Sequence, residues 1–220
     1  MTDTYRIDKT NKVRQLRDKA NYDRAVVHAV LDAGLVATVG FVQEHAAVVV
    51  PMIYGRDGET LFLHGARKAR IIRMLEENER VCVNVTLLDG IVYARSAFNS
   101  SMNYRSVTVF GAPTLVADND EKLRAMRVIS EHTMPGRWDE LRDPLPREVK
   151  MTGVIALRID SASAKIASGM PDDEADDYAI PIWAGVLPIE SRLTELRSDE
   201  RLVDNAAPSA AVRAMQGKLL

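Results

Sequence analysis

The stretch AAVVVPMIYGRDGETLFLHG, residues 46–65, decides the fold of this chain. Two runs rich in β-branched and aromatic residues flank Asp57-Gly58, and an Asp-Gly pair between such runs is a strong hairpin signal. The run LVATVGFV at 35–42 has the same character. We therefore predict three antiparallel strands here, and the hairpins disfavour a parallel, doubly wound sheet.

The pattern continues outward from this core. Further strand candidates are 81–88, 91–96, 104–117 and 153–166, the last as one strand or two, and Asp89-Gly90 is a second hairpin signal. Helical spacing predicts two helices within 12–31 broken near Asn21, one helix after His64, and one at 120–132. We predict a mainly β fold with peripheral helices, a six-stranded antiparallel split β-barrel. It forms a single domain over 1–204, followed by a flexible C-terminal tail at 205–220.

The composition excludes several classes of protein. The 220 residues are 46% hydrophobic, and 29 Lys and Arg balance 31 Asp and Glu. No global positive field exists to hold nucleic acid or an anionic membrane. The single cysteine, Cys82, permits no intrachain disulfide, and no apolar run approaches the ~18 residues of a membrane span. The charged N-terminus lacks the apolar core of a secretory signal, so together with the single cysteine it predicts a cytoplasmic protein. The four histidines lack metal-ligand spacing, so we expect no metal site.

The segment HGARKARIIRML, residues 64–75, has its charges in an unusual order. Four cationic side chains precede a run of glutamates, although a helix favours anions at its N-terminus. One interpretation is a solvated surface, with Arg70 and Arg73 paired to Glu76 and Glu77. The other is that a phosphate binds at the helix start, held by Arg67 and Lys68. Neither a Rossmann fingerprint nor a P-loop motif is present to explain such a phosphate.

The order of three segments resembles the FMN-binding split-barrel superfamily that includes pyridoxamine 5'-phosphate oxidase. These segments are 46–72, then NYRSVTVFG at 103–111, then PIWAGVLP at 181–188. The resemblance covers roughly residues 20–195 and is strongest to the branch of flavin-nucleotide-binding and nitroimidazole-resistance proteins. It implies FMN as cofactor and a homodimer with cofactor sites at the subunit interface.

The resemblance also implies roles for particular residues. The family's phosphate-gripping Gly-Ser-Arg-Lys segment is matched by Gly65, Ala66, Arg67 and Lys68, which keep both cations and lose the hydroxyl. The family's Arg-Gln pair is matched by Arg105 and Ser106, and its Phe-Trp-Gln-Gly segment places Trp183 against the cofactor of the partner subunit. The strand whose backbone follows the flavin ring corresponds to Val48, Val49, Val50, Pro51 and Met52.

Two of these residues have competing interpretations. His64 precedes the basic turn, so it either faces the flavin or a substrate, or it is a strand-end histidine satisfied by backbone. Trp183 is either a cofactor contact or an ordinary interface or core aromatic.

The chain departs from the true oxidases where these bind their substrate. Val186-Leu187-Pro188 replaces their Arg-Leu-His segment, so oxidation of pyridoxamine phosphate is not expected. Our leading hypothesis is an FMN-dependent oxidoreductase acting on an unidentified small molecule. The alternatives are a non-catalytic flavin-binding or sensor protein, and the same barrel with deazaflavin or haem.

Overall fold

The computed structural model describes residues 3–220 and divides them into two compact units. The first unit combines the residues up to Gly34 with Asn84–Val109 and Ser161–Glu190. The second combines Leu35–Val83, Phe110–Asp160 and Ser191–Leu220. The predicted single domain over 1–204, of which residues 1 and 2 lie outside the described residues, stays a prediction.

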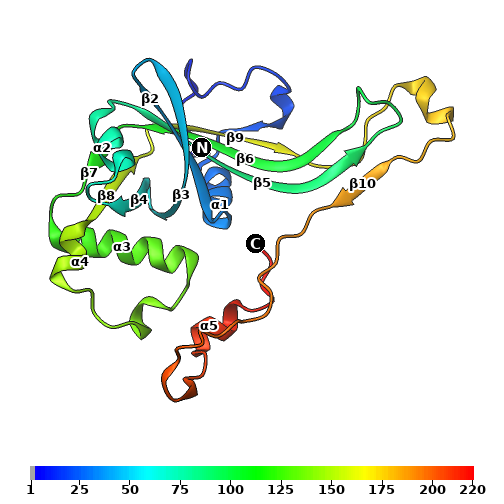
Figure 1. Ribbon diagram of the computed structural model, residues 1–220. Coiled ribbons are helices and arrows are strands. Elements are labelled where there is room, and N and C mark those ends of the chain that lie inside the picture. The colour runs from blue at the N-terminus through cyan, green and yellow to red at the C-terminus, as the bar shows by residue number, and fades with distance from the viewer. Residues whose placement is uncertain (1–2) are drawn as a thin grey trace. The chain divides into compact units, whose positions relative to one another are not determined.

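The second unit contains the stretch that opened the sequence analysis. Its strands lie side by side in the order β2-β3-β4-β8-β7, and every neighbouring pair is antiparallel. The long β2–β3 hairpin is visible in Figure 1. The bounds are β2 (Val36–Gln43), β3 (Ala46–Asp57), β4 (Thr60–Ala66), β8 (Thr152–Arg158) and β7 (Pro113–Leu115).

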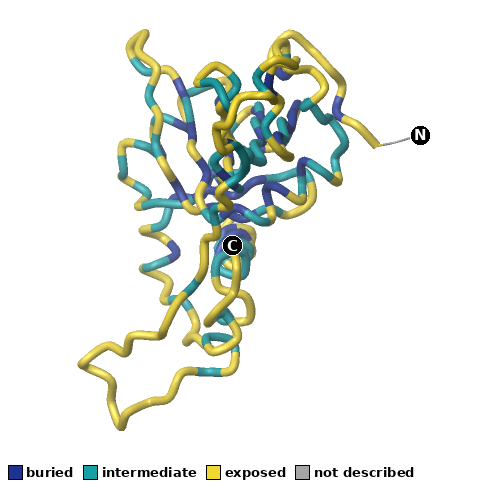
Figure 2. The backbone as a smooth tube through the Cα atoms, turned by 90° about the vertical axis from the view of Figure 1, so that its right-hand side faces the viewer, coloured by how far each residue is buried: buried dark blue, intermediate teal, exposed yellow. Residues whose placement is uncertain are grey.

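The predicted hairpin at Asp57-Gly58 is confirmed. Asp57 pairs with Thr60 across the turn between β3 and β4, and Gly58 has a φ of 55°. A positive φ is the conformation that glycine adopts without steric cost. Along β2, buried and exposed residues alternate, as expected for a strand with one face in the core; Figure 2 shows the alternation of dark blue with teal and yellow.

Helix α3 (Asn119–Thr133) covers this sheet. The carboxylate of Asp118 caps the helix by accepting a hydrogen bond from the Glu121 N–H. Helix and sheet share one hydrophobic cluster, formed by Phe62, Val116, Ala125, Ile129 and Val154. This cluster fixes the strands that lead into the candidate site.

Gly55 allows α3 to lie directly on β3. A Cβ at this position would be 2.7 Å from the Val128 carbonyl oxygen and 2.8 Å from the Ile129 Cα, which are backbone atoms. We expect Gly55→Ala to lower the free energy of unfolding by about 1–3 kcal/mol, the usual cost of overpacking. Gly40→Ala is the matched control, because its nearest neighbour would be 3.7 Å away. Urea unfolding of both variants measures the difference, and equal midpoints would contradict the close packing.

Three shorter helices complete the second unit. They are α2 (Arg70–Glu77), α4 (Pro146–Met151) and α5 (Ala210–Met215). Helix α2 buries Ile72 and Leu75, and Ser209 caps α5 by accepting a hydrogen bond from the Val212 N–H. Helix α5 lies within the segment predicted to be a flexible tail, and the mobility of that segment stays a prediction.

The first unit begins with less helix than the sequence analysis predicts. Of the two helices expected within 12–31, only α1 (Arg24–Ala33) forms, with Asp23 as its N-cap. Residues 17–19 make a short 3-10 turn instead, and Ala20–Asn21 forms β1, paired with β9 (Ser161–Ala167). The prediction of a helix before Asn21 is therefore wrong, because backbone pairing to β9 replaces the local helical preference.

The predicted hairpin at Asp89-Gly90 is also wrong. Strand β5 (Val81–Tyr93) runs through both residues without a turn, and β10 (Gly185–Pro188) pairs with it there. A Cβ on Gly90 would lie 2.9 Å from Val186 Cγ1, so the glycine serves the close approach of β10. The next strand, β6 (Ser101–Gly111), follows only after the loop at 94–100, and the strand order is β1-β9-β6-β5, with β10 on β5.

The mainly β, antiparallel architecture with peripheral helices is confirmed. The described residues form ten strands, of which β1, β7 and β10 have four residues or fewer. Among residues 3–220, no helix has the length and apolar character to cross a bilayer.

Candidate functional site

The cationic turn lies between β4 and α2. Strand β4 ends at Ala66 and helix α2 begins at Arg70, so Arg67 and Lys68 precede the helix instead of forming its first turn. The Arg67 N–H donates to the Met151 carbonyl at 2.7 Å, and the Ala69 N–H donates to the Ala66 carbonyl at 2.8 Å. These bonds hold the turn against the end of α4.

Gly153 is a residue of this site that sequence reasoning missed. A Cβ at Gly153 would lie 2.7 Å from Ile72 Cγ2 and 3.1 Å from the Arg67 Cα. Only glycine, which has no side chain, lets β8 lie this close to the turn. No sequence signal marks this role, because the glycine stands between ordinary strand residues.

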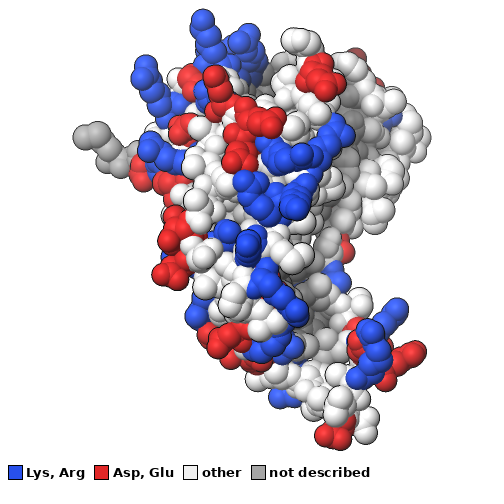
Figure 3. Space-filling model, turned by 60° about the vertical axis from the view of Figure 1, so that its left-hand side comes forward, with Lys and Arg blue, Asp and Glu red and all other residues white. Residues whose placement is uncertain are grey.

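The cations of the turn differ in their partners. Arg67 forms an ion pair with Glu76 at 3.2 Å, and both side chains are more than one-third exposed. Arg70 donates to the Gln43 side-chain oxygen. Lys68 is exposed and has no ion pair with any residue of the described chain. Figure 3 brings the side with α2 and α4 forward and shows basic side chains gathered there, with acidic ones among them.

This pairing differs from the surface interpretation of the sequence. That interpretation paired Arg70 and Arg73 with Glu76 and Glu77, whereas Glu76 pairs with Arg67. The N-cap residue of α2, Ala69, provides no side-chain hydrogen bond to the helix start. The first backbone N–H groups of α2 therefore have no capping side chain, which is the situation in which a helix N-terminus binds an anion.

His64 lies on β4, two residues before the turn. Its Nδ1 atom is buried and has no hydrogen-bond partner among the described residues. Burial also lowers the pKa of the imidazole below its ordinary value, which favours the neutral form. A buried polar atom without a protein partner is uncommon, so the position of His64 beside the cationic turn makes it a candidate for contact with a ligand.

The strand segment assigned to the flavin ring lies in the same unit as the cationic turn. Residues 48–52 pair with β2, from Val48 opposite Phe41 to Met52 opposite Ala37. The pairing of β3 with β4 covers only residues 54–57, so residues 48–52 lie beyond its end. Met52 is buried, whereas Val49 is 62% exposed.

Arg105 and Ser106 belong to the first unit, on β6. The Arg105 guanidinium donates to both carboxylate oxygens of Asp89, with Nη2 to Oδ1 at 2.7 Å, and this hydrogen bonding raises the pKa of Arg105. Ser106 Oγ contacts Asn84 Nδ2 at 3.1 Å and Thr86 Oγ1 at 2.8 Å. Sequence reasoning missed Asp89, because it assigned that residue to a turn.

Trp183 also belongs to the first unit, directly before β10. Its side chain is 70% exposed, and its ring centroid lies 5.8 Å from that of Tyr93. Gly185 accommodates the indole, since a Cβ there would be 2.9 Å from Trp183 Cζ2. Trp183 is therefore not a core residue of its unit, which leaves a cofactor contact and an interface aromatic as its interpretations.

The structure thus groups the predicted site residues by unit. The second unit holds residues 48–52 together with His64, Gly65, Arg67 and Lys68, and the first holds Arg105, Ser106 and Trp183. Their roles toward a cofactor stay predictions. No group of three His, Cys, Asp or Glu side chains suited to a metal ion occurs within residues 3–220.

Comparison with known proteins supports the architecture. A family model described as pyridoxamine 5'-phosphate oxidase matches residues 23–166. No curated protein matches the chain. The chain belongs to the pyridoxamine 5'-phosphate oxidase family, and the predicted split-barrel fold is confirmed.

Two solved structures resemble nearly the whole chain. The flavocytochrome Anf3 from Azotobacter vinelandii is 33% identical, with a TM-score of 0.90, and the match covers 96% of this chain and 98% of that one. The FAD and heme binding protein from Mycobacterium smegmatis is 35% identical, with a TM-score of 0.87, covering 90% and 98%. A 5-nitroimidazole antibiotic resistance protein from Bacteroides thetaiotaomicron, described as putative, is 23% identical over 67% of this chain and 86% of that one, with a TM-score of 0.55, and shares the fold.

Proposed function

We propose that this chain is a flavin-dependent redox protein that holds a flavin together with haem. The observation that carries the proposal is the similarity to a flavocytochrome and to an FAD and haem binding protein over at least 90% of this chain. This favours the haem-containing alternative of the sequence analysis over an oxidoreductase with FMN alone. When bound, the flavin would supply hydride and electron transfer and the haem single-electron transfer.

The cationic turn fits the phosphate of a flavin nucleotide. Lys68 is exposed and unpaired among the described residues, and Arg67 needs only to exchange a partly exposed ion pair with Glu76. Such pairs contribute about 0–1 kcal/mol, less than the ~1.5–3 kcal/mol of a hydrogen bond to a charged group. The uncapped start of α2 supplies further N–H donors. These features support a phosphate site made of Gly65, Arg67 and Lys68.

His64 fits a haem ligand. Haem iron in proteins is commonly bound by a neutral imidazole, and burial favours that form of His64. Its ring also carries a buried nitrogen that lacks a partner among the described residues. The backbone pairing of His64 with Val154 on β8 fixes the position of the residue in the sheet.

The identity of the cofactors is directly testable. We expect protein purified from haem-sufficient cells to release FAD, separated from FMN by chromatography against standards, and to show a Soret band with about one haem per chain by the pyridine haemochrome assay. Release of FMN without haem would instead support an oxidoreductase that depends on FMN alone, the leading hypothesis of the sequence analysis. Protein that binds neither group under these conditions would refute the proposal.

A turnover assay separates an enzyme from a carrier or sensor. Reduction of the holoprotein by NADH or NADPH, followed by reoxidation with oxygen or a nitroaromatic compound, is the expected behaviour of an oxidoreductase. Bound flavin that never cycles with any donor would favour the non-catalytic alternative.

We further propose that the protein is a homodimer with cofactor sites at the subunit interface. The first unit exposes large apolar side chains, with Phe98 at 91%, Trp183 at 70% and Leu187 at 53%. Large apolar side chains that are exposed in one unit make it the better candidate for an interaction surface. The expected mass in light scattering is twice the 24.4 kDa of the chain.

Phe98→Glu tests this surface. We expect the dimer dissociation constant to rise at least about tenfold, because a buried aromatic anchor would be replaced by a charge. Val203→Glu is the control, since Val203 is 76% exposed but lies in the second unit. Dilution series by light scattering compare the variants. A Phe98→Glu protein as dimeric as the control would exclude this residue from the interface.

A further inference from the structure

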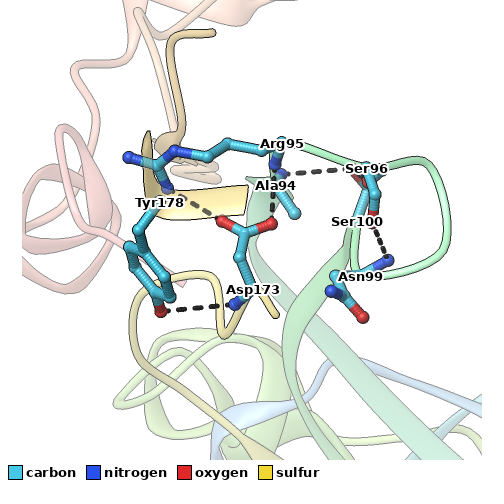
Figure 4. A network of polar contacts seen from close by, with 7 residues as sticks. All are labelled: Ala94, Arg95, Ser96, Asn99, Ser100, Asp173 and Tyr178. Atoms are coloured by element: carbon cyan, nitrogen blue, oxygen red, sulfur yellow. Dashed lines mark hydrogen bonds and ion pairs between the residues drawn. The ribbon is translucent and has the colours of Figure 1, made fainter. Parts of the chain in front are cut away.

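Arg95 and Asp173 form an ion pair in the first unit. Neither residue belongs to the predicted site. The Asp173 side chain has 0% exposure, and its two oxygens accept hydrogen bonds from the Arg95 N–H and from Arg95 Nη1, each at 2.8 Å. Figure 4 shows the carboxylate between the two donors of the same arginine. A carboxylate without solvent is retained only where such partners compensate its charge.

Tyr178 contacts both members of the ion pair. Its hydroxyl oxygen lies 3.3 Å from the Asp173 N–H, and the Arg95 guanidinium carbon lies 4.9 Å from the centre of its ring. We call Arg95, Asp173 and Tyr178 the latch. It joins the loop after β5 to the segment between β9 and β10, residues 168–184.

The loop that carries Arg95 is itself braced. Ser100 Oγ accepts from the Ala94 N–H at 3.1 Å and donates to the Ser96 carbonyl at 2.8 Å, and Ser96 Oγ accepts from the Asn99 N–H at 3.1 Å (Figure 4). The latch therefore attaches the later segment to a loop with its own hydrogen bonds. A loop braced in this way can hold the attached segment in a fixed position.

The positioned segment, residues 174–184, ends in exposed apolar side chains. Ile180, Ile182 and Trp183 are 42%, 49% and 70% exposed. The latch anchors one end of this segment, and the pairing of Gly185 with Tyr93 anchors the other. Exposed apolar groups held in place before binding lose less conformational freedom when they bind.

We propose that the latch is a positioning device that presents Trp183 to the flavin bound by the partner subunit, with Asp173 as its central positioning residue. The inference rests on the proposed function, because it requires a flavin for Trp183 to contact. It assigns a role to three residues that the family resemblance leaves unassigned. The competing explanation is that the ion pair only stabilises the first unit.

The test compares flavin affinity in two backgrounds. In the otherwise unchanged holoprotein, we expect Asp173→Asn to raise the FAD dissociation constant about tenfold, measured by flavin fluorescence on dilution. In a Trp183→Ala background, the same Asp173→Asn change should add nothing, because the residue acts through Trp183. Equal effects in both backgrounds, or no effect in either, would overturn the inference.

A second measurement reports on the segment itself. The N–H groups of Asp177, Ile180 and Ile182 are hydrogen-bonded within 174–182, and Asp173→Asn should speed their hydrogen exchange about tenfold. Asp139→Asn is the matched control, since it breaks an exposed ion pair with Arg127 in the second unit. Unchanged exchange in the Asp173 variant would also overturn the inference.

Asp173→Asn leaves the arginine without its charged partner and could prevent folding. The double variant Arg95→Met, Asp173→Leu removes both charges, which proteins tolerate better than the loss of one. It should fold and still show the faster exchange and the weaker flavin binding. An unaltered chain that binds no FAD would refute the proposed function, whereas FAD binding that ignores these changes would refute the latch alone.

Discussion

Replacing His64 with alanine is expected to reduce the haem content of the purified protein by about tenfold or more, because loss of a metal ligand costs more than loss of its supporting contacts. His64 is half-buried, burial lowers the pKa of its imidazole, and its buried Nδ1 has no partner among the described residues. Soret absorbance and the pyridine haemochrome assay, referred to protein concentration, measure the outcome.

The control for this experiment is His45→Asn. His45 lies exposed in the turn between β2 and β3 with a φ of 65°, a conformation that asparagine tolerates. This variant should keep its haem. A His64→Ala protein with the parental Soret band and an unchanged melting temperature would remove His64 from the coordination of iron and leave it a packing residue.

The fate of two Asp-Gly pairs shows what local sequence can and cannot predict. Asp57-Gly58 forms a turn because strands of matching character flank it and pair with each other. Asp89-Gly90 has the same local signal but lies inside β5, where Gly90 admits β10 and Asp89 pairs with Arg105. Both of these contacts are with residues far along the chain, so no local pattern could have predicted them.

The candidate site shows the same division. The cationic turn and its position after a strand could be predicted from residues 60–73, because charge and strand pattern are local. The need for Gly153 next to the turn, and the bond from the Arg67 N–H to the Met151 carbonyl, depend on how β8 and α4 approach. The burial of His64 Nδ1 likewise follows from packing, which a histidine in a sequence does not reveal.

The sequence predicts the latch even less well than the cationic turn. The acidic run PDDEADDY at 171–178 has the character of a solvated loop, yet one of its carboxylates is completely buried on Arg95. Nothing in the run distinguishes Asp173 from its neighbours. A charge run is usually a solvated face, and the single exception depends on an arginine 78 residues away.

Replacing Arg67 and Lys68 together with alanine is expected to weaken flavin binding by at least about tenfold, because two charge-assisted contacts of ~1.5–3 kcal/mol each are lost. The ion pair of Arg67 with Glu76, which flavin binding must break, offsets only about 0–1 kcal/mol of this loss. The fold should be unaffected, because the Arg67 contact with α4 is made by its backbone N–H. Flavin fluorescence on dilution of the holoprotein measures the affinity, and its dependence on salt should weaken in the variant.

The matched control is Arg197→Ala with Lys218→Ala, which removes the same charge from exposed positions in the C-terminal part of the second unit. Long-range attraction of an anionic ligand would suffer equally in both double variants, whereas a direct phosphate contact would be lost only in the first. Equal affinities would therefore assign Arg67 and Lys68 to the solvated surface. Tighter binding in the control than in the Arg67 and Lys68 variant, by the expected factor, would locate the phosphate at the turn that Gly153 supports.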